Sequence, residues 1–351
     1  MRRNTQPRIN DRFVNIKRID SQGGNGFFSL VFNAYDEITK REVILKFFHP
    51  LKVSDLDRLQ RFHREGEVLK KLMGQQNIIQ CIDGVCILPI QLSSSGILIN
   101  QDYFFIPMEK AKATVEDLIY SSYLSPLDCL YYLREMCKGV ARLHAKKICH
   151  RDLKPNNFFF FSKDNIKIGD FGTAKFLDGS MPNIRSSYIL PVGHLDYIAP
   201  ELICEIGISD DLSYGSDIYS LGAILFEIFS KEILSSHIYN AALLSELLMV
   251  KSVISRMSFK DKLIVYSGSI NSISCSTRWP DIFSFNDFVP PSIKHYLNSL
   301  YLDMCQFDLN KRLRNFTTIY RRINICILIL RNELKYKHRI MQKKSLRGLK
   351  I

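Results

Sequence analysis

The strongest constraint on the fold of this chain is a change in sequence pattern near residue 114. Before that point, short runs rich in β-branched and aromatic residues predict strands around one helical segment. The strand segments are 27–33, 42–48 and 103–108, and the helical segment is 56–72. After residue 114 the pattern is mainly helical, at 126–143, at 216–229 and from Pro290-Pro291 onward. Strands followed by helices predict a two-lobed α+β fold, with a small β-rich lobe and a larger, mainly helical lobe.

The net charge of +13 is concentrated at the two ends of the chain. Residues 1–18 carry +5 and residues 331–351 carry +7, which leaves the body between them nearly neutral. A nearly neutral body offers no extended basic surface, so no nucleic-acid partner is expected. We expect the basic ends to be solvated, and docking to an acidic partner or an anionic membrane is the alternative.

The sequence shows no secretory or membrane-spanning segment. Its basic start is not followed by an apolar stretch, and its longest apolar run, 325–330, is too short to span a bilayer. The nine cysteines are scattered and form no CxxC pair, which argues against a zinc ribbon and a disulfide framework. We therefore expect a soluble, cytoplasmic protein in a reducing environment.

Residues 150–157, HRDLKPNN, carry the most specific chemistry in the sequence. They place one carboxylate, one cation and one amide close together, as Asp152, Lys154 and Asn157. Phosphoryl transfer uses such a set: a base or orienting group for the attacking hydroxyl, a charge on the transferred group, and an oxygen ligand for magnesium. Thirteen residues after Asn157, the triplet Asp170-Phe171-Gly172 supplies a second carboxylate for the same metal.

These motifs resemble the catalytic loop and the magnesium-binding triplet of eukaryotic-type protein kinases, and they are most similar to serine/threonine protein kinases. The resemblance implies ATP and Mg²⁺ as cofactors, with Mn²⁺ as a possible substitute. It also implies transfer of the γ-phosphoryl group to serine and threonine hydroxyls of protein substrates, and autophosphorylation. In these terms Asp152, Lys154 and Lys46 are catalytic, while Asn157 and Asp170 hold the metal. The position of Lys154, two residues after Asp152, favours serine/threonine over tyrosine substrates.

The resemblance also predicts the domain organisation. It implies a basic N-terminal tail at 1–10, a protein kinase domain at 11–330 and a basic C-terminal tail at 331–351. Within the domain, the N-lobe is expected at 11–109, the hinge at 108–112 and the C-lobe at 113–330.

A nucleotide site between the lobes follows from the same resemblance. The residues expected there are Gly24, Gly26, Ser29, Val31, Ile44, Lys46, Glu65, Glu109, Ala111 and Phe159. Gly24 and Gly26 let backbone N–H groups approach phosphate oxygens, and Ser29 stands where the family has a third glycine. Backbone groups of Glu109 and Ala111 are expected to meet the adenine edge.

The base is expected between Val31 and Ile44 on one side and Phe159 on the other. Ile44 and Phe159 are larger than the family's usual side chains at these positions. Because added volume strains a tightly packed slot, we expect a weaker nucleotide affinity or a shifted base.

Lys46 ends the apolar run 43–46, where a buried ammonium group requires a carboxylate partner. The resemblance names Glu65, which repeats with Leu69 and Leu72 along one helical face. Glu67 is the competing candidate, although it lies outside that register.

Four residues are assigned to the activation segment: Thr173, Ser186, Ser187 and His194. Arg151 beside the catalytic aspartate implies a cationic pocket for a phosphorylated segment, with Ser186 or Ser187 as the expected phosphosite. His194 replaces a threonine that in the family bonds the catalytic aspartate and lysine. It either substitutes through a ring nitrogen or is a surface residue.

Three residues are expected to be structural. Glu201 closes the activation segment in the motif Ala199-Pro200-Glu201, and Arg312 is expected as its buried partner. Asp217 is expected to hold the catalytic loop through backbone N–H groups.

Two other classes of protein share parts of this pattern. A pseudokinase acting as a scaffold or allosteric binder is free to lose Lys46, Glu65, Asp152, Asn157 and Asp170, so their joint presence favours catalysis. A small-molecule kinase of the aminoglycoside or choline type lacks the Ala-Pro-Glu motif and the long segment 173–198, which form a platform for peptide substrates.

Overall fold

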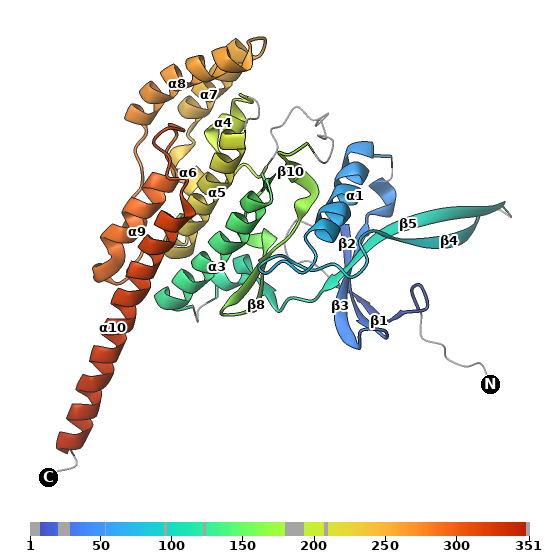
Figure 1. The fold of residues 1–351 in the computed structure, drawn as a ribbon, viewed down its shortest axis with the longest axis horizontal. Helices are drawn as coiled ribbons and strands as arrows, with labels where there is room; N and C mark the ends of the chain where they lie inside the picture. The colour runs from blue at the N-terminus through green and yellow to red at the C-terminus, as the bar shows by residue number, and fades with distance from the viewer. Residues whose placement is uncertain are drawn as a thin grey trace.

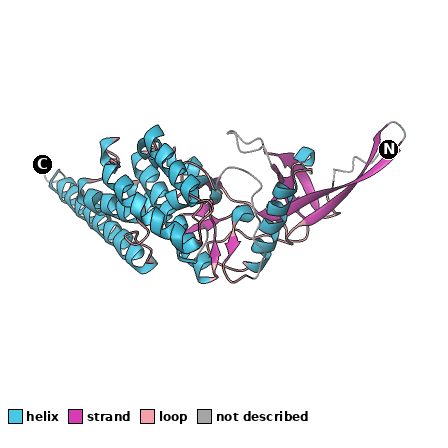
Figure 2. Cartoon of the chain, turned by 90° about the horizontal axis from the view of Figure 1, so that it is seen from above, coloured by secondary structure: helices cyan, strands magenta, loops and turns pink. Residues whose placement is uncertain are grey.

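The computed structural model describes residues 8–19, 29–52, 54–94, 97–121, 124–179, 193–206 and 210–348. Two lobes are separated along the long axis of the molecule (Figure 1). Strands dominate the N-terminal lobe and helices the C-terminal lobe, and the view from above shows the same division (Figure 2). The predicted two-lobed α+β fold is confirmed.

The N-lobe is a five-stranded antiparallel sheet with the strand order β1-β2-β3-β5-β4. The strands are β1 (Phe13–Arg18), β2 (Ser29–Asp36), β3 (Arg41–Phe48), β4 (Cys86–Ser94) and β5 (Ile97–Glu109). Helix α1 (Leu56–Lys71) begins after Asp55, whose carboxylate accepts the N–H of Arg58. Its Phe62 ring lies 5.5 Å from that of Phe48, which joins the helix to the end of β3.

The register of the sheet separates a core face from a cleft face. Val43 and Leu45 are buried in a small core that also contains Phe105. Because side chains alternate along a strand, Ile44 and Lys46 point to the opposite face, where both are half-buried. Val31 is directly opposite Lys46 in the pairing of β2 with β3, so it lies on the same face.

Strands β4 and β5 continue as a two-stranded arm beyond the rest of the sheet. Strand β3 pairs with β5 only between Val43↔Glu109 and Phe47↔Phe105, whereas β4 and β5 remain paired as far as Ser94↔Ile97. The arm projects from the lobe (Figure 1). The sequence pattern predicted only the part of β5 that lies within the sheet.

The described part of the C-lobe consists mainly of helices, with one two-stranded and one three-stranded sheet of short strands near the lobe junction. The helices are α2 (Val115–Ile119), α3 (Pro126–Ala145), α4 (Pro200–Ile203), α5 (Asp210–Ser230), α6 (Leu234–Ile238), α7 (Ala241–Ile254), α8 (Phe259–Ser276), α9 (Pro291–Met304) and α10 (Phe316–Gly348). The strands are β6 (Ala113–Thr114), β7 (Ile148–Cys149), β8 (Phe158–Ser162), β9 (Asn165–Ile168) and β10 (Lys175–Phe176). Helix α3 begins as predicted, because Ser125 accepts the N–H of Asp128 and Pro126 occupies the first turn.

Helices α7 and α8 were not predicted from the sequence. Their buried residues do recur at helical spacing, as Leu243, Leu247 and Val250 of α7 do. Large apolar side chains such as Leu248 and Met249 are exposed between them, so the buried stripe does not stand out in the sequence. Within the described part of the chain, no helix has both the length and the apolar sequence needed to cross a membrane.

Candidate active site

The ammonium group of Lys46 lies between two carboxylates at the junction of the lobes. Its Nζ donates to the two oxygens of Glu65 at 2.8 and 2.7 Å, and it lies 3.3 Å from Oδ1 of Asp170. Burial alone would lower the pKa of Lys46, but the carboxylates of Asp170 and Glu65 raise it above its ordinary value. The same ammonium group lowers the pKa of Asp170. One cation thus faces two anions, and the cluster keeps an excess of negative charge.

Two secondary-structure elements bring this cluster together. Lys46 lies on the cleft face of β3, as the strand register requires. Glu65 lies on the inward side of α1 with Phe62 and Leu69, whereas Glu67 is exposed. Of the two candidate partners, Lys46 therefore contacts Glu65.

Asp217, near the start of α5, holds the loop that carries Asp152. Its carboxylate accepts the backbone N–H groups of His150 at 2.9 Å and Arg151 at 2.8 Å. Nε2 of His144 lies 2.9 Å from the same carboxylate. Burial alone would raise the pKa of Asp217, but the bonds from His144 and His150 lower it below its ordinary value. Arg151 has a φ of 66°, a conformation that persists only where its surroundings hold it.

Asp152 has one carboxylate oxygen that no described residue satisfies. Nζ of Lys154 lies 3.9 Å from Oδ2 of Asp152, while Oδ1 is buried without a hydrogen-bond partner in the described structure. Buried carboxylate oxygens are normally hydrogen-bonded. This oxygen is therefore available to accept a hydrogen bond or a proton from a ligand.

Asn157 and Asp170 are the two oxygen-bearing residues predicted to hold a metal, and the backbone joins them, because the N–H of Gly169 donates to the carbonyl of Asn157 at 3.0 Å. The side-chain nitrogen of Asn157 donates to the backbone carbonyl of Asp152 at 2.8 Å, so the amide oxygen is the atom that remains for a cation. The Asp170 carboxylate is 43% exposed, and its backbone φ is 64°. Amide and carboxylate oxygens suit a hard divalent cation such as Mg²⁺.

Glu109, which the sequence analysis placed in the hinge, is held by its side chain and by its backbone. Its carboxylate accepts Nζ of Lys167 and the N–H of Gln80, each at 2.7 Å, and its own N–H donates to the Gln80 carbonyl at 3.0 Å. Ala111, two residues later, is half-buried. Lys167 was missed by the sequence analysis, although its place between the buried Ile166 and Ile168 marks it as facing the other way.

The start of the activation segment is held by two arginines. The Arg151 guanidinium donates to the carbonyl of Thr173 at 2.8 Å, and Arg64 of α1 donates to that of Ala174 at 2.9 Å. The Thr173 hydroxyl donates to the carbonyl of His150 at 3.0 Å. Burial, and then the nearby Arg64 cation, lower the pKa of Arg151 to about 10. Arg64 was not identified from the sequence, where it reads as one charge among several in the helix.

Of the remaining predicted site residues, His194 and Ser29 are described by the structure and four others are not. Nδ1 of His194 lies 3.5 Å from the Asp196 carboxylate and the side chain is 43% exposed, which matches a surface residue. Ser29 begins β2. Gly24, Gly26, Ser186 and Ser187 lie outside the described residues.

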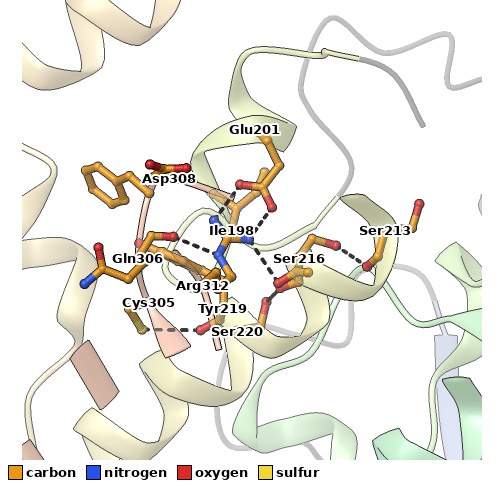
Figure 3. Close-up of polar contacts among 12 residues, drawn as sticks. Ile198, Glu201, Ser213, Ser216, Tyr219, Ser220, Cys305, Gln306, Asp308 and Arg312 are labelled. Atoms are coloured by element: carbon orange, nitrogen blue, oxygen red, sulfur yellow. Dashed lines mark hydrogen bonds and ion pairs between the residues drawn. The ribbon is translucent and has the colours of Figure 1, made fainter. Parts of the chain in front are cut away.

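Glu201 and Arg312 form a fully buried ion pair in the C-lobe (Figure 3). Arg312 donates to both carboxylate oxygens, the longer bond being 2.9 Å, and also to the carbonyls of Gln306 at 2.8 Å and Gly215 at 3.0 Å. The predicted pairing is therefore present, and the arginine also satisfies backbone acceptors. This pair connects the end of the activation segment to the loop before α10.

Comparisons with known proteins agree with this arrangement. A family profile described as the protein kinase domain matches residues 18–321, more than four fifths of the chain. Serine/threonine-protein kinase cds1 of Schizosaccharomyces pombe is 27% identical over 60% of this chain and 44% of its own length. PrkC, a serine/threonine-protein kinase of Bacillus subtilis, is 28% identical over 64% of this chain and 31% of its own. Misshapen-like kinase 1 of Rattus norvegicus is 31% identical over 58% of this chain and 15% of its own. The chain thus spans less than half the length of these relatives.

Proposed function

This chain belongs to the protein kinase family, and from that premise we propose that it transfers the γ-phosphoryl group of ATP to serine and threonine hydroxyls of protein substrates, itself included. The observation that carries the proposal is the unpartnered Oδ1 of Asp152, whose other carboxylate oxygen lies 3.9 Å from Nζ of Lys154 and whose backbone carbonyl accepts the side-chain N–H of Asn157. A scaffold would have no use for a buried carboxylate oxygen left in this state.

Each group has a role that its contacts support. Asp152 accepts the hydrogen bond of the substrate hydroxyl and then its proton, and Lys154 stabilises charge on the transferred phosphoryl group. Lys46, held by Glu65, binds the α- and β-phosphates. Asn157 and Asp170 would hold Mg²⁺, which when bound neutralises charge on the nucleotide phosphates.

The test is phosphoryl transfer by the purified full chain. Labelled ATP and Mg²⁺ are supplied with the protein alone and with generic basic and acidic proteins. We expect transfer by the unaltered protein and a loss of about 10²- to 10⁴-fold in Asp152→Asn, since that is the usual contribution of a positioned base. Asp164→Asn is the matched control, because Asp164 is 76% exposed in the turn between β8 and β9.

Three outcomes separate the candidate functions. Transfer that Asp152→Asn abolishes and Asp164→Asn retains supports the kinase. Absence of transfer by the unaltered protein with Mg²⁺ or Mn²⁺, over a range of pH, would favour a scaffold or allosteric binder. Equal transfer by Asp152→Asn and the unaltered protein would remove Asp152 from the mechanism.

We also propose that phosphorylation at Ser186 or Ser187 activates the enzyme. Arg151 and Arg64, which hold the carbonyls of Thr173 and Ala174, support this proposal because two adjacent guanidinium groups can bind a phosphate. A Ser186→Ala/Ser187→Ala double variant is then expected to lose most transfer activity at unchanged thermal stability. Full activity of the double variant would exclude this regulation.

An intracellular, reducing location belongs to the same proposal. None of the nine cysteines, all of which lie within the described residues, forms a disulfide, and seven of them are buried. Fractionation of cells followed by thiol labelling tests it, and disulfide-linked protein in a secreted fraction would contradict it.

A further inference from the structure

The residue before Asp170 is Gly169, and neighbouring side chains occupy the space that a side chain at this position would need. A Cβ added to Gly169 would lie 2.8 Å from Cε2 of Phe159 and 2.9 Å from Cγ2 of Ile79. Both distances are shorter than carbon atoms tolerate, and Cδ2 of the same ring would lie at 3.3 Å. Gly169 is not among the glycines with a positive φ, so its backbone does not require glycine. The requirement is one of space.

The backbone around Gly169 is fixed on both sides and has little freedom to move away from the ring. The Gly169 N–H donates to the carbonyl of Asn157 at 3.0 Å, and the Gly169 carbonyl is 2.9 Å from Nε2 of His150. Ile79 is buried, and its N–H donates to the carbonyl of Ile168 at 2.9 Å. Phe159 is half-buried, so of the Gly169 backbone, Ile79 and Phe159 it is the group that can move.

The placement of Phe159 follows from strand β8. Phe158 is fully buried in the core of the C-lobe, so Phe159 points to the opposite face of the strand. One edge of its ring lies against Gly169, the residue next to the Asp170 that Lys46 contacts. The ring is thus beside the charged cluster, on the C-lobe side of the cleft.

We infer that Gly169 is a positioning residue for the nucleotide base: by omitting a side chain it holds Phe159 as an aromatic floor against which a planar purine stacks. The inference rests on the proposed function and adds a residue to it. Phe159 had been expected to overfill the slot and to weaken nucleotide binding. The empty position at Gly169 accommodates that volume, so the larger side chain becomes a stacking surface instead.

The test measures adenosine binding by calorimetry, because adenosine carries the base without phosphates or metal. It uses the full-length chain and the variants Gly169→Ala, Phe159→Leu and Gly169→Ala/Phe159→Leu. We expect Gly169→Ala to weaken binding about 10-fold or more, as overpacking of a fixed site does. Phe159→Leu should weaken it several-fold by removing the stacking surface. The double variant should bind much better than Gly169→Ala and approach Phe159→Leu, since the two contacts of the added methyl group with the ring are gone and only that with Cγ2 of Ile79 remains.

A matched control is Gly268→Ala in α8, where an added Cβ meets no atom within 4 Å. Its adenosine affinity should equal that of the unaltered protein. If Gly169→Ala lowers the melting temperature, the Phe159→Leu exchange should restore part of the loss, because it removes the clash with the ring and leaves the contact with Ile79.

The outcomes distinguish this inference from the function on which it rests. Binding losses that add in the double variant, or a Gly169→Ala variant with unchanged affinity, would overturn the inference alone. Absence of adenosine binding by the unaltered protein would overturn the inference, whereas adenosine binding without any phosphoryl transfer would overturn the proposed kinase activity. Rescue by Phe159→Leu supports the inference, because a disturbance of Asp170 by the added methyl group would not respond to a change at residue 159.

Discussion

Two buried ion pairs of this molecule use the same chemistry for different ends. The Arg312–Glu201 pair lies deep in the C-lobe, where the arginine also donates to the carbonyls of Gly215 and Gln306. The Lys46 cluster lies at the lobe junction, where one ammonium group faces the carboxylates of Glu65 and Asp170. The first set of contacts satisfies its members internally. The second is left with excess negative charge, and the Asp170 carboxylate is 43% exposed.

The two clusters differ in whether any of their charged groups is left without a partner inside the protein. A network whose members are all bonded to one another in a low-dielectric core stabilises the fold, and removing one member leaves the others buried without a partner. A cluster with unbalanced charge contributes less to stability, but a bound ligand can neutralise that charge. Burial of the ion pair therefore does not distinguish a functional site from a structural one. The balance between donors and acceptors does.

The largest expected effect on stability is that of Arg312→Met. This change removes the donor to four acceptors at once and leaves the Glu201 carboxylate buried without its partner. We expect the free energy of unfolding to fall by about 3–5 kcal/mol, as measured by urea unfolding. A Glu201→Met/Arg312→Met variant should recover part of the loss, because no uncompensated charge is left. A loss below about 1 kcal/mol in the single variant is what an exposed ion pair would give, and it would contradict a fully buried, fully bonded pair.

Lys46→Met tests the Lys46 cluster in the opposite way. Phosphoryl transfer should fall by about 10²-fold or more, because an electrostatic clamp on the phosphates is removed. The free energy of unfolding should fall by only about 1–2 kcal/mol, because a proton can neutralise the Glu65 carboxylate that is left. Transfer assays and urea unfolding on the same preparation measure both quantities. A stability loss as large as that of Arg312→Met would make the two clusters equivalent and contradict the comparison.

The pH dependence of stability extends the comparison to two aspartates. The pKa of Asp217 is lowered in the folded chain, so this residue contributes stability above its ordinary pKa of 3.8 and loses it as the pH falls through the folded-state value. Asp217→Asn should therefore flatten the decline in stability below that pH. Asp170→Asn should flatten it less, because Asp170 is partly exposed and Lys46 keeps Glu65. Urea unfolding at about pH 5 and at several pH values below 3.8 gives both slopes, and an equal effect of the two variants would be inconsistent with this difference.

Sequence reasoning predicted contacts where local spacing fixes which way a residue faces. The helical register of α1 distinguished Glu65 from Glu67 as the residue that contacts Lys46. The catalytic role of Asp152 and the metal-binding role of Asp170 stay predictions. Sequence reasoning failed where space rather than chemistry decides, as at Gly169, since the Phe159 ring that fills its missing side chain is ten residues away in sequence. The arm of β4 and β5 was missed because it pairs only with itself: β3 contacts β5 no farther than Phe47↔Phe105, so nothing in the spacing of the other strands indicates how far the arm extends.

The smallest effect is expected from the charges that belong to neither cluster. Helix α10 continues past its last buried residue, Leu330, and the side chains of Leu334 and Tyr336 are 53% and 67% exposed. Truncation after Leu330 removes the basic segment 331–351 and should change the free energy of unfolding by less than about 0.5 kcal/mol and leave phosphoryl transfer unaltered. Truncation after Tyr320 is the contrasting control, because it also removes the buried Ile323, Cys326 and Ile327 and should destabilise the C-lobe. If the basic segment instead docks to an acidic partner or an anionic membrane, the full chain should sediment with phosphatidylserine vesicles or bind an acidic protein, and the shorter chain should do neither. The cations of this segment would then differ from both Arg312 and Lys46, because their anionic partners would lie on another molecule rather than within the fold or on the nucleotide.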